Sequence, residues 1–422
     1  MNLLLESSIV NLQSKISITG SKSETNRLLL LQALYPNITL ENISNSDDSE
    51  VMTKALQNFQ LPTSNFQLID VHHAGTAMRF LTAYFAIQEG RETVLTGSSR
   101  MKERPIKILV NALRQLGAEI SYGEKDGFPP IRIKGKKLTQ NNVSLPANVS
   151  SQYISALLLI APKLENGIVL TLEGEITSVP YIKMTLALLN EIGVVTSFIK
   201  NKISVKPFVT LSAVEGLQLT IESDWSSASY FYSIVALSPI GTEITLSSYK
   251  KNSLQGDSAL AEIYKDFGVE TTFTNNTIIL KKASNCKLSI INYQLNASPD
   301  VAQTIAVTCF GLGIGCHLTG LHTLKIKETD RLLALKNELG KLGATVSITD
   351  DSLSLEPSSP LLWRGAGGEV KIKTYQDHRM AMAFAPLALK VPIIIEDAEV
   401  VSKSYPNFWN DLKSIGFLIT EQ

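Results

Sequence analysis

The sequence predicts an α/β protein of two domains, each built from repeated units of helix and strand. The first observation is length, because 422 residues exceed what one ordinary hydrophobic core accommodates. The second is that two kinds of segment recur along the chain at regular spacing. The third is composition, since 44% hydrophobic and 7% aromatic residues fit compact domains and exclude a fibrous or disordered chain.

The first recurring segment is a charged amphipathic stretch that ends in an apolar residue, a glycine and a strand-like run. Successive copies are separated by 76, 75, 75 and 73 residues, and their glycines are Gly117, Gly193, Gly268, Gly343 and Gly416. Each glycine fits the left-handed residue that ends a helix, and the β-branched residues after it indicate a strand.

The second recurring segment has six copies, each with a polar start, an apolar helix of about a dozen residues, a short loop and a strand. These helices are apolar nearly all round, so we expect them to be buried, whereas the helices of the first segment carry a charged face for solvent. Six copies predict six α/β units, three in each domain, with sheets packed around or against the buried helices.

The chain has no overall charge that would attract it to nucleic acid or an acidic membrane, because Lys plus Arg and Asp plus Glu both number 39. Any anion site must therefore be built locally. The start "MNLLLESSIV" has no basic region, and no window holds the roughly 20 apolar residues of a membrane span. We expect a soluble, cytosolic protein. Cys286, Cys309 and Cys316 are odd in number, and Cys309 and Cys316 lie inside an apolar helix-like run, which indicates reduced core residues rather than a disulfide or zinc set.

Uncommon polar residues gather at the N-terminal ends of the buried helices, which we call the helix heads. The first head, "GSKSETNR", carries Lys22 and Arg27, and the spacing of Ser21 and Glu24 predicts a capping box. Helix heads bind phosphate and carboxylate through free N–H groups, so cations there are unfavourable unless an anionic ligand is present.

Further cations stand at the sixth head and in the loops before the charged helices. A single such residue is usually a solvated surface charge, but repetition at equivalent places indicates a shared anion site. These cations are Arg100, Lys102, Arg104, Lys325, Lys327, Arg331, Arg379 and Lys403.

Three other motifs are weak. His72 and His73 are adjacent, so on a strand they point apart, and no third ligand has suitable spacing for a metal. "GLGIG", from Gly311 to Gly315, follows a helix-like run and lacks the final glycine of a dinucleotide loop, which predicts a helix-to-strand turn. No G-x-S-x-G element is present.

Taken in order, the motifs resemble those of the 5-enolpyruvylshikimate-3-phosphate synthase family over nearly the whole chain. They are "GSKSETNR", "SDDSEVM", "AGTAMRFL", "TGSSRMKERPI", "SSQYISALLL", "SVPYIKMTL", "DWSSASYF", "PDVAQTIA", "KIKETDRL", "TYQDHRMAMAFA" and "SKSYPNFW". The resemblance implies an inside-out α/β barrel of two domains with three βαβαββ units each. Residues 21–220 would form one domain, residues 1–20 with 221–422 the other, and the active site would lie in the cleft between them.

The resemblance also implies an activity. The carboxyvinyl group of phosphoenolpyruvate would pass to the 5-hydroxyl of shikimate 3-phosphate, with release of phosphate through a tetrahedral intermediate, in the shikimate pathway of aromatic amino acid biosynthesis. No cofactor, metal, nucleic acid or membrane is implied, and a monomer is expected by family analogy alone. A UDP-sugar enolpyruvyl transferase of the same fold, or a non-catalytic anion-binding relative, are the alternatives. The first would need a catalytic cysteine in its second unit, yet no cysteine precedes residue 286.

Site residues follow from the matched motifs. Shikimate 3-phosphate is expected at Lys22, Ser23, Arg27, Ser150, Ser151, Gln152, Ser178, Tyr181, Asp300 and Lys327. Phosphoenolpyruvate is expected at Lys22, Gly75, Arg104, Gln152, Arg331, Arg379 and Lys403, with Gly75 leaving room for close approach of a ligand. Asp300 would be the base at the 5-hydroxyl and Glu328 the donor at the methylene carbon, with Lys22 sharing this work. Neighbouring cations should keep both carboxylates ionised unless burial opposes it.

Four positions depart from the family pattern. His73 replaces the usual Asn before "AGTAMR", Phe80 the usual Pro after it, Val179 a Lys, and Thr323 an Asn. These departures bear on substrate affinity and inhibitor sensitivity more than on the reaction itself.

Overall fold

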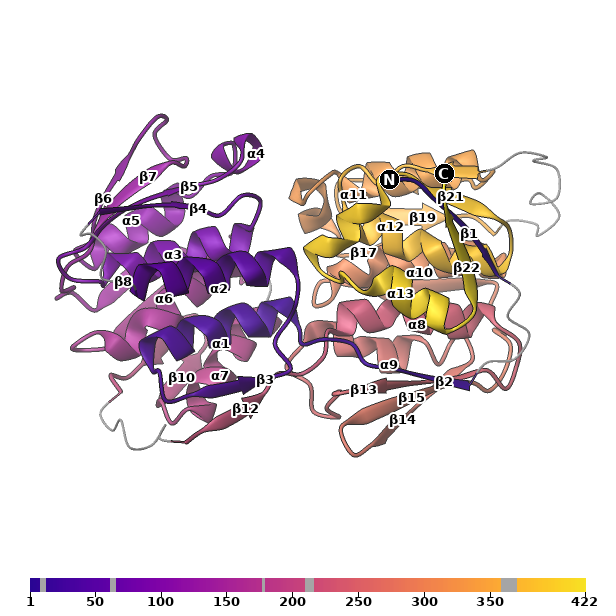
Figure 1. The fold of residues 1–422 in the computed structure, drawn as a ribbon, viewed down its shortest axis with the longest axis horizontal. Helices are drawn as coiled ribbons and strands as arrows, with labels where there is room; N and C mark the ends of the chain where they lie inside the picture. Colours follow the sequence, from indigo (N-terminus) through magenta and orange to yellow (C-terminus); the bar gives the residue numbers. More distant parts are fainter. Residues whose placement is uncertain (8–12, 61–65, 177–178, 209–215, 358–369) are drawn as a thin grey trace. The chain divides into compact units, whose positions relative to one another are not determined.

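The computed structural model describes residues 1–7, 13–60, 66–176, 179–208, 216–357 and 370–422. The chain divides into two compact units (Figure 1). Unit 1 contains residues 1–19 and 222–422, and unit 2 contains residues 20–221.

Unit 2 alternates helices and strands along one continuous stretch of chain. Its elements are α1 (Lys22–Leu34), β3 (Thr39–Glu41), α2 (Asp47–Gln60), β4 (Phe66–Asp70), α3 (Gly75–Ala86), β5 (Glu92–Thr96), α4 (Ser99–Lys102), α5 (Lys107–Gln115), β6 (Glu119–Tyr122), β7 (Ile131–Lys134), β8 (Asn142–Pro146), α6 (Ser151–Ile160), η1 (Ala161–Lys163), β9 (Ile168–Glu173), α7 (Val179–Glu191), β10 (Thr196–Ile199), β11 (Lys202–Val205) and β12 (Gln218–Thr220).

Unit 1 combines two N-terminal strands with the second half of the chain. Its elements are β1 (Leu3–Ser7), β2 (Gln13–Ile16), α8 (Trp225–Leu237), β13 (Glu243–Ser247), η3 (Gly256–Ala259), α9 (Leu260–Ile263), β14 (Val269–Thr274), β15 (Thr277–Lys282), β16 (Ile290–Gln294), η4 (Pro299–Val301), α10 (Ala302–Leu312), β17 (Gly315–Thr319), η5 (His322–Ile326), α11 (Arg331–Lys341), β18 (Val346–Ile348), β19 (Ser352–Leu355), β20 (Val370–Ile372), α12 (His378–Phe384), η7 (Ala385–Leu389), β21 (Ile393–Ile395), η8 (Ala398–Lys403), α13 (Phe408–Ser414) and β22 (Phe417–Glu421).

Within the described residues, five sheets share one pattern of four strands. In the order β4-β5-β7-β6 the first pair is parallel and the next two are antiparallel, and the same sequence of pairings recurs in β8-β9-β11-β10, β2-β13-β15-β14, β16-β17-β19-β18 and β20-β21-β1-β22. A sixth sheet pairs β12 with β3 in parallel. Strands β1, β2 and β12 therefore join sheets whose other strands lie far away in the sequence.

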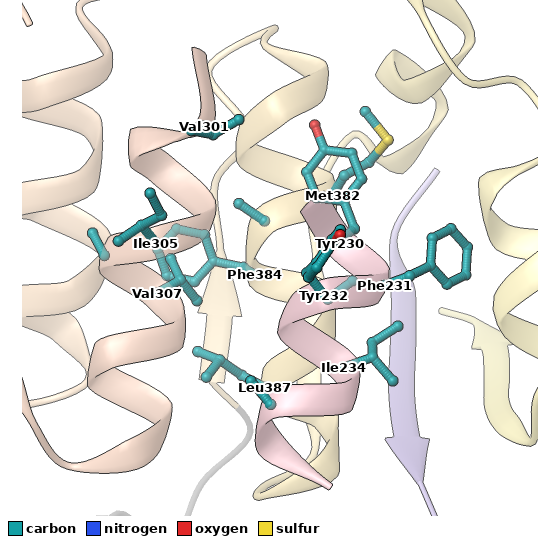
Figure 2. Close-up of a cluster of buried hydrophobic side chains, with 14 of the residues drawn as sticks. Tyr230, Phe231, Tyr232, Ile234, Val301, Ile305, Val307, Met382, Phe384 and Leu387 are labelled. Atoms are coloured by element: carbon teal, nitrogen blue, oxygen red, sulfur yellow. The ribbon is translucent and has the colours of Figure 1, made fainter. Parts of the chain in front are cut away.

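The apolar helices form the centre of each unit, as the sequence predicts. In unit 1, α10 packs against α8 and α12 (Figure 2). Strand β13 packs on α8, and strand β17 packs on α10. All residues of α8 from Trp225 to Leu237 are buried, which explains why this helix has no polar face. In unit 2, α1, α3 and α6 pack on one another in the same way. The sheets lie outside these apolar helices, which is the inside-out arrangement.

The glycines at the helix ends adopt the backbone conformation that the repeat predicts. Their φ angles lie between 77° and 103°, in the left-handed region where a side chain is strained: Gly117, Gly193, Gly268, Gly343 and Gly416. Gly313 ends α10 in the same conformation, and β17 begins two residues later, so "GLGIG" is a helix-to-strand turn.

Three local predictions are wrong. Ser21 is the N-cap residue of α1, but its side chain makes no capping hydrogen bond, so no capping box forms. His72 and His73 lie in a turn rather than on a strand, and His72 has a φ of 47°. Cys316 belongs to strand β17 and not to the helical run that holds Cys309.

Two features are absent from the described residues. None of their helices has the length and hydropathy needed to cross a membrane. Among the same residues, no three His, Cys, Asp or Glu side chains are grouped so that they could hold a metal ion.

The helical core of unit 1 predicts a large effect of truncation. Phe231 is fully buried on α8 (Figure 2), so Phe231→Ala should lower the free energy of unfolding of unit 1 by about 3–5 kcal/mol through lost burial and a cavity. Urea unfolding followed by circular dichroism measures this change. Leu418→Ala is the control, because Leu418 is 58% exposed and should lose less than about 0.5 kcal/mol. Equal losses in the two variants would contradict the packing described.

Candidate functional site

A buried arginine organises the candidate site of unit 1. Arg331, at the start of α11, is 2% exposed and donates to three carboxylates from separate segments. Its Nε lies 2.6 Å from Asp377 Oδ2, its Nη1 lies 2.8 Å from Asp300 Oδ1, and its Nη2 lies 2.8 Å from Glu328 Oε2. A guanidinium has five N–H donors in a rigid plane, so these three contacts fix the relative positions of the carboxylates.

Asp300 receives two more cations. Its Oδ2 lies 3.2 Å from Arg379 Nη2, and its Oδ1 lies 3.5 Å from Lys327 Nζ. Burial raises the pKa of Asp300, but Arg379, Lys327 and Arg331 together lower it further, so the net pKa is well below the usual range. Asp300 is therefore ionised, as the sequence led us to expect. We call Asp300, Lys327, Glu328, Arg331, Asp377 and Arg379 the Arg331 cluster.

Asp377 is a central member of this cluster that the sequence analysis missed. Its side chain has no exposed surface, and it caps α12 by accepting a hydrogen bond of 2.8 Å from the backbone N–H of Arg379. The residue just before it, Gln376, accepts a hydrogen bond of 2.8 Å from Lys403 Nζ through its backbone carbonyl. The segment before α12 thus positions both Arg379 and Lys403.

Another buried carboxylate, that of Asp257, lies close enough to the cluster to interact with its charges. Asp257, on η3, accepts a hydrogen bond from Ser226 Oγ. Burial, and then the charge of Asp300, raises the pKa of Asp257 to about 6, although Arg379 and Ser226 oppose this shift. No family motif used in the sequence analysis contains Asp257, so sequence reasoning did not single it out.

In unit 2, Lys22 and Arg27 both lie in the first turns of α1. Lys22 Nζ forms an ion pair of 3.3 Å with Asp48. Arg27 is buried, and its three nitrogens donate to Thr185 Oγ1 at 2.8 Å, Ser155 Oγ at 2.9 Å and the backbone carbonyl of Ser23 at 2.6 Å.

The surroundings of Arg27 contain rings and hydroxyls. The guanidinium lies 5.4 Å from the centre of the Phe80 ring and 5.9 Å from that of Tyr181, and burial lowers its pKa to about 10. Within the part of the chain that the structure describes, Arg27 has no carboxylate within ion-pair distance. A buried cation supported in this way is suited to bind an anion.

The head of α3 brings two more guanidinium groups together. A Cβ atom on Gly75 would lie 2.6 Å from Arg104 Nη1, so the room expected there for a ligand is filled by the Arg104 side chain. Arg79 is buried and donates to the Gly75 carbonyl at 3.1 Å, and burial, followed by the charge of Arg104, lowers its pKa to about 10. Arg79 belongs to the motif "AGTAMRFL", but no role is predicted for it from the sequence.

The head of α6 lies against that of α3. Ser150 is the N-cap of α6, and its Oγ accepts from the Gln152 N–H at 3.4 Å. Gln152 Nε2 donates to Thr76 Oγ1 at 3.1 Å, which links the two helix heads, and Ser151 is buried beside them. Tyr181 lies on α7, and Ser178 lies outside the described residues.

Three of the loop cations named from the sequence are surface charges. Each makes an exposed ion pair with a nearby acid, which is the ordinary environment of a single surface cation, so their place in a shared anion site stays a prediction. The pairs are Arg100 with Glu103 at 2.8 Å, Lys102 with Glu124 at 2.8 Å, and Lys325 with Asp350 at 2.5 Å.

The four residues that depart from the family pattern lie in different parts of the structure. His73 Nδ1 lies 2.9 Å from Ser98 Oγ, next to the Gly75 segment. Phe80 is fully buried and covers Arg27. Val179 begins α7, and Thr323 lies in η5.

The fold, the Arg331 cluster of unit 1 and the buried arginines Arg27 and Arg79 of unit 2 are typical of a protein that binds small anions and holds carboxylates among cations. Residues 60–412 match the family model for EPSP synthase (3-phosphoshikimate 1-carboxyvinyltransferase). The chain is 47% identical over 413 residues to the 3-phosphoshikimate 1-carboxyvinyltransferase of Bacteroides fragilis (strain YCH46), with 96% of each chain covered. It is 36% identical over 428 residues to that of Haemophilus influenzae, again with 96% of each covered.

The chain belongs to the EPSP synthase family, which confirms the resemblance found in the sequence. A solved structure of EPSP synthase from Acinetobacter baumannii has the same fold, with a TM-score of 0.80 and 21% identity over all of both chains. The predicted fold class is therefore confirmed.

The raised pKa of Asp257 predicts a pH-dependent effect of Asp257→Asn. An unfolded Asp titrates near pH 4, so between about pH 4 and 6 the folded protein binds more protons and loses stability as pH rises, by up to about 3 kcal/mol in total. The Asn variant lacks this loss while retaining an acceptor for Ser226. Its advantage in urea unfolding should be small at pH 4.5 and largest above pH 6.5. The same advantage at both pH values would contradict the raised pKa.

Proposed function

We propose that this chain transfers the carboxyvinyl group of phosphoenolpyruvate to the 5-hydroxyl of shikimate 3-phosphate and releases phosphate. The observation that carries the proposal is the Arg331 cluster. It holds an ionised carboxylate, Asp300, in direct contact with Lys327, Arg331 and Arg379. An addition and elimination between two anionic substrates needs a proton acceptor beside cations that hold the substrates.

The residues of unit 2 are assigned mainly to shikimate 3-phosphate. Arg27 uses one hydrogen on each of its three nitrogens for protein contacts, so both terminal nitrogens keep a second hydrogen for a carboxylate. The N–H groups and hydroxyls at the head of α6 suit the phosphate. The assigned residues are Lys22, Ser23, Arg27, Ser150, Ser151, Gln152, Ser178 and Tyr181, with Asp300 and Lys327 from unit 1.

Phosphoenolpyruvate is assigned to cations from both units. Arg104, held against Gly75, would meet it from unit 2 together with Lys22 and Gln152. Arg331, Arg379 and Lys403 would meet it from unit 1. The cations offset the repulsion between two substrates that both carry phosphate and carboxylate groups.

The low pKa of Asp300 makes it a weak base before substrates bind. Anionic substrates that contact Lys327, Arg331 and Arg379 would compensate these positive charges, and the pKa of Asp300 would rise toward the range in which it accepts a proton. Asp300 then takes the proton of the 5-hydroxyl. Glu328 pairs with Arg331 and is 37% exposed, so once an anionic substrate compensates Arg331 it can take up a proton from solvent and deliver it to the methylene carbon, with Lys22 sharing this work. In the elimination the Glu328 carboxylate takes a proton back from the methyl group, and phosphate leaves.

The remaining expectations complete the proposal. We place the active site in the cleft between the domains, and closure of the domains would exclude water from the reacting atoms. We propose a monomer by analogy with the family alone. The cytoplasmic location stays a prediction.

The direct test is phosphate release on mixing the protein with phosphoenolpyruvate and shikimate 3-phosphate. Release that requires both compounds supports the proposal. Release only when a UDP-sugar replaces shikimate 3-phosphate would assign the chain to the other enolpyruvyl transferases. Binding of both compounds without release would make it a non-catalytic relative.

Asp300→Asn tests the base directly. Asn retains an acceptor for Arg331 but cannot take the hydroxyl proton, so turnover should fall roughly a hundredfold or more. Calorimetric titration with shikimate 3-phosphate should show affinity within a few-fold of wild type. Undiminished turnover would refute the role of Asp300.

Gly75→Ala tests the position of Arg104. The added Cβ would lie 2.6 Å from Nη1 and 2.8 Å from Nη2, so the guanidinium must move. Loss of one charge-assisted contact of about 1.4 kcal/mol corresponds to a roughly tenfold higher KM for phosphoenolpyruvate. The KM for shikimate 3-phosphate should stay within about twofold. Gly340→Ala is the control, because a Cβ there meets no atom within 4 Å. An unchanged KM in Gly75→Ala would contradict the assignment of Arg104.

A further inference from the structure

The segment between β20 and α12 contains an unusual turn. Tyr375 and Gln376 have φ angles of 54° and 58°, so two successive residues with side chains adopt the left-handed conformation. Such residues are strained and persist only where the surrounding structure holds them. The turn lies directly before Asp377, the residue that caps α12 and binds Arg331.

Glu338, on α11, holds this turn. Its side chain has no exposed surface, and both of its oxygens accept hydrogen bonds. Oε1 accepts from Tyr375 Oη at 2.6 Å, and Oε2 accepts from the backbone N–H of Lys373 at 3.1 Å and from Lys341 Nζ at 2.6 Å. The carboxylate thus binds the turn at two points, and Lys341 compensates its charge.

This left-handed turn positions two cations assigned to phosphoenolpyruvate, Lys403 and Arg379. The carbonyl of Gln376 accepts from Lys403 Nζ, and Asp377 accepts from the N–H of Arg379. The N–H of Asp377 donates to the carbonyl of Thr374 at 2.9 Å, which closes the turn. A change in the path of residues 374–376 would therefore move the contact points of both Lys403 and Arg379.

Helix α11 binds the segment at two places. Arg331 contacts Asp377, and Glu338 contacts Lys373 and Tyr375. The two residues are seven apart in the helix, which places them on the same face about two turns from each other. The helix that begins with the arginine of the Arg331 cluster thus also fixes the turn that leads to Arg379.

We propose that Glu338 and Tyr375 are positioning residues for phosphoenolpyruvate, acting through Arg379 and Lys403. This inference rests on the proposed function. Neither residue is assigned to substrate. The Glu338 carboxylate is engaged by protein groups on both oxygens, and Tyr375 directs its hydroxyl to Glu338. They act by holding the left-handed turn in the path that presents the two cations.

Tyr375→Phe is the primary test because it removes only the hydroxyl that Glu338 binds. The KM for phosphoenolpyruvate at saturating shikimate 3-phosphate should rise about five- to tenfold, whereas the KM for shikimate 3-phosphate should stay within about twofold. Glu338→Gln should change the same two constants in the same directions. Because Glu338→Gln disturbs a buried ion pair and can impair folding, the conclusion is drawn from Tyr375→Phe.

Tyr293→Phe is the matched control. Tyr293, on β16 of unit 1, donates its hydroxyl to the Asp266 carboxylate, so the variant loses the same kind of bond at a place that contacts no assigned residue. Both tyrosine variants should lose some thermal stability, but only Tyr375→Phe should change the KM for phosphoenolpyruvate. A wild-type KM in Tyr375→Phe, or equal changes in the two variants, would overturn the inference while the wild-type chain stays active. An inactive wild-type chain would overturn the proposed function and this inference with it.

Discussion

The structure of unit 1 depends on the contact of one buried guanidinium, that of Arg331, with three carboxylates. Removing such charges from water is costly and is offset only when each charge is paired and hydrogen-bonded. The Arg331 cluster meets this condition, because the cations Lys327, Arg331 and Arg379 balance the carboxylates of Asp300, Glu328 and Asp377. In such a balanced cluster an acid–base group stays ionised, and its pKa can still rise when anionic substrates bind.

The buried cations of unit 2 have different surroundings from those of unit 1. Its buried guanidinium groups, Arg27 and Arg79, contact hydroxyls, carbonyls and rings, and among the described residues no carboxylate pairs with either. Burial lowers the pKa of both, and for Arg27 the charges of Tyr181 and Glu24 offset only part of this effect. Unit 2 thus offers buried guanidinium groups for holding anions, and unit 1 offers carboxylates paired with cations for moving protons.

The sequence predicts the repeats well because they depend on local rules, namely glycine at helix ends and apolar residues around buried helices. It predicts Asp300, Glu328 and Arg331 because they lie in recognisable motifs. It does not predict Asp377 or Glu338, since their roles depend on a turn whose left-handed path no local pattern reveals. The sequence also does not distinguish the environments of Arg104 and Arg100. Only the folded structure places Arg104 against Gly75 and pairs Arg100 with a glutamate on the surface. The spacing of the repeats also does not predict that β1, β2 and β12 pair with strands far away in the sequence.

The most direct test of this account is a crystal structure of the protein with shikimate 3-phosphate bound. One substrate molecule should contact Lys22, Arg27 and the head of α6 from unit 2. At its 5-hydroxyl, the same molecule should contact Asp300 and Lys327 from unit 1. A substrate held entirely by one unit, with Asp300 away from the 5-hydroxyl, would contradict this prediction.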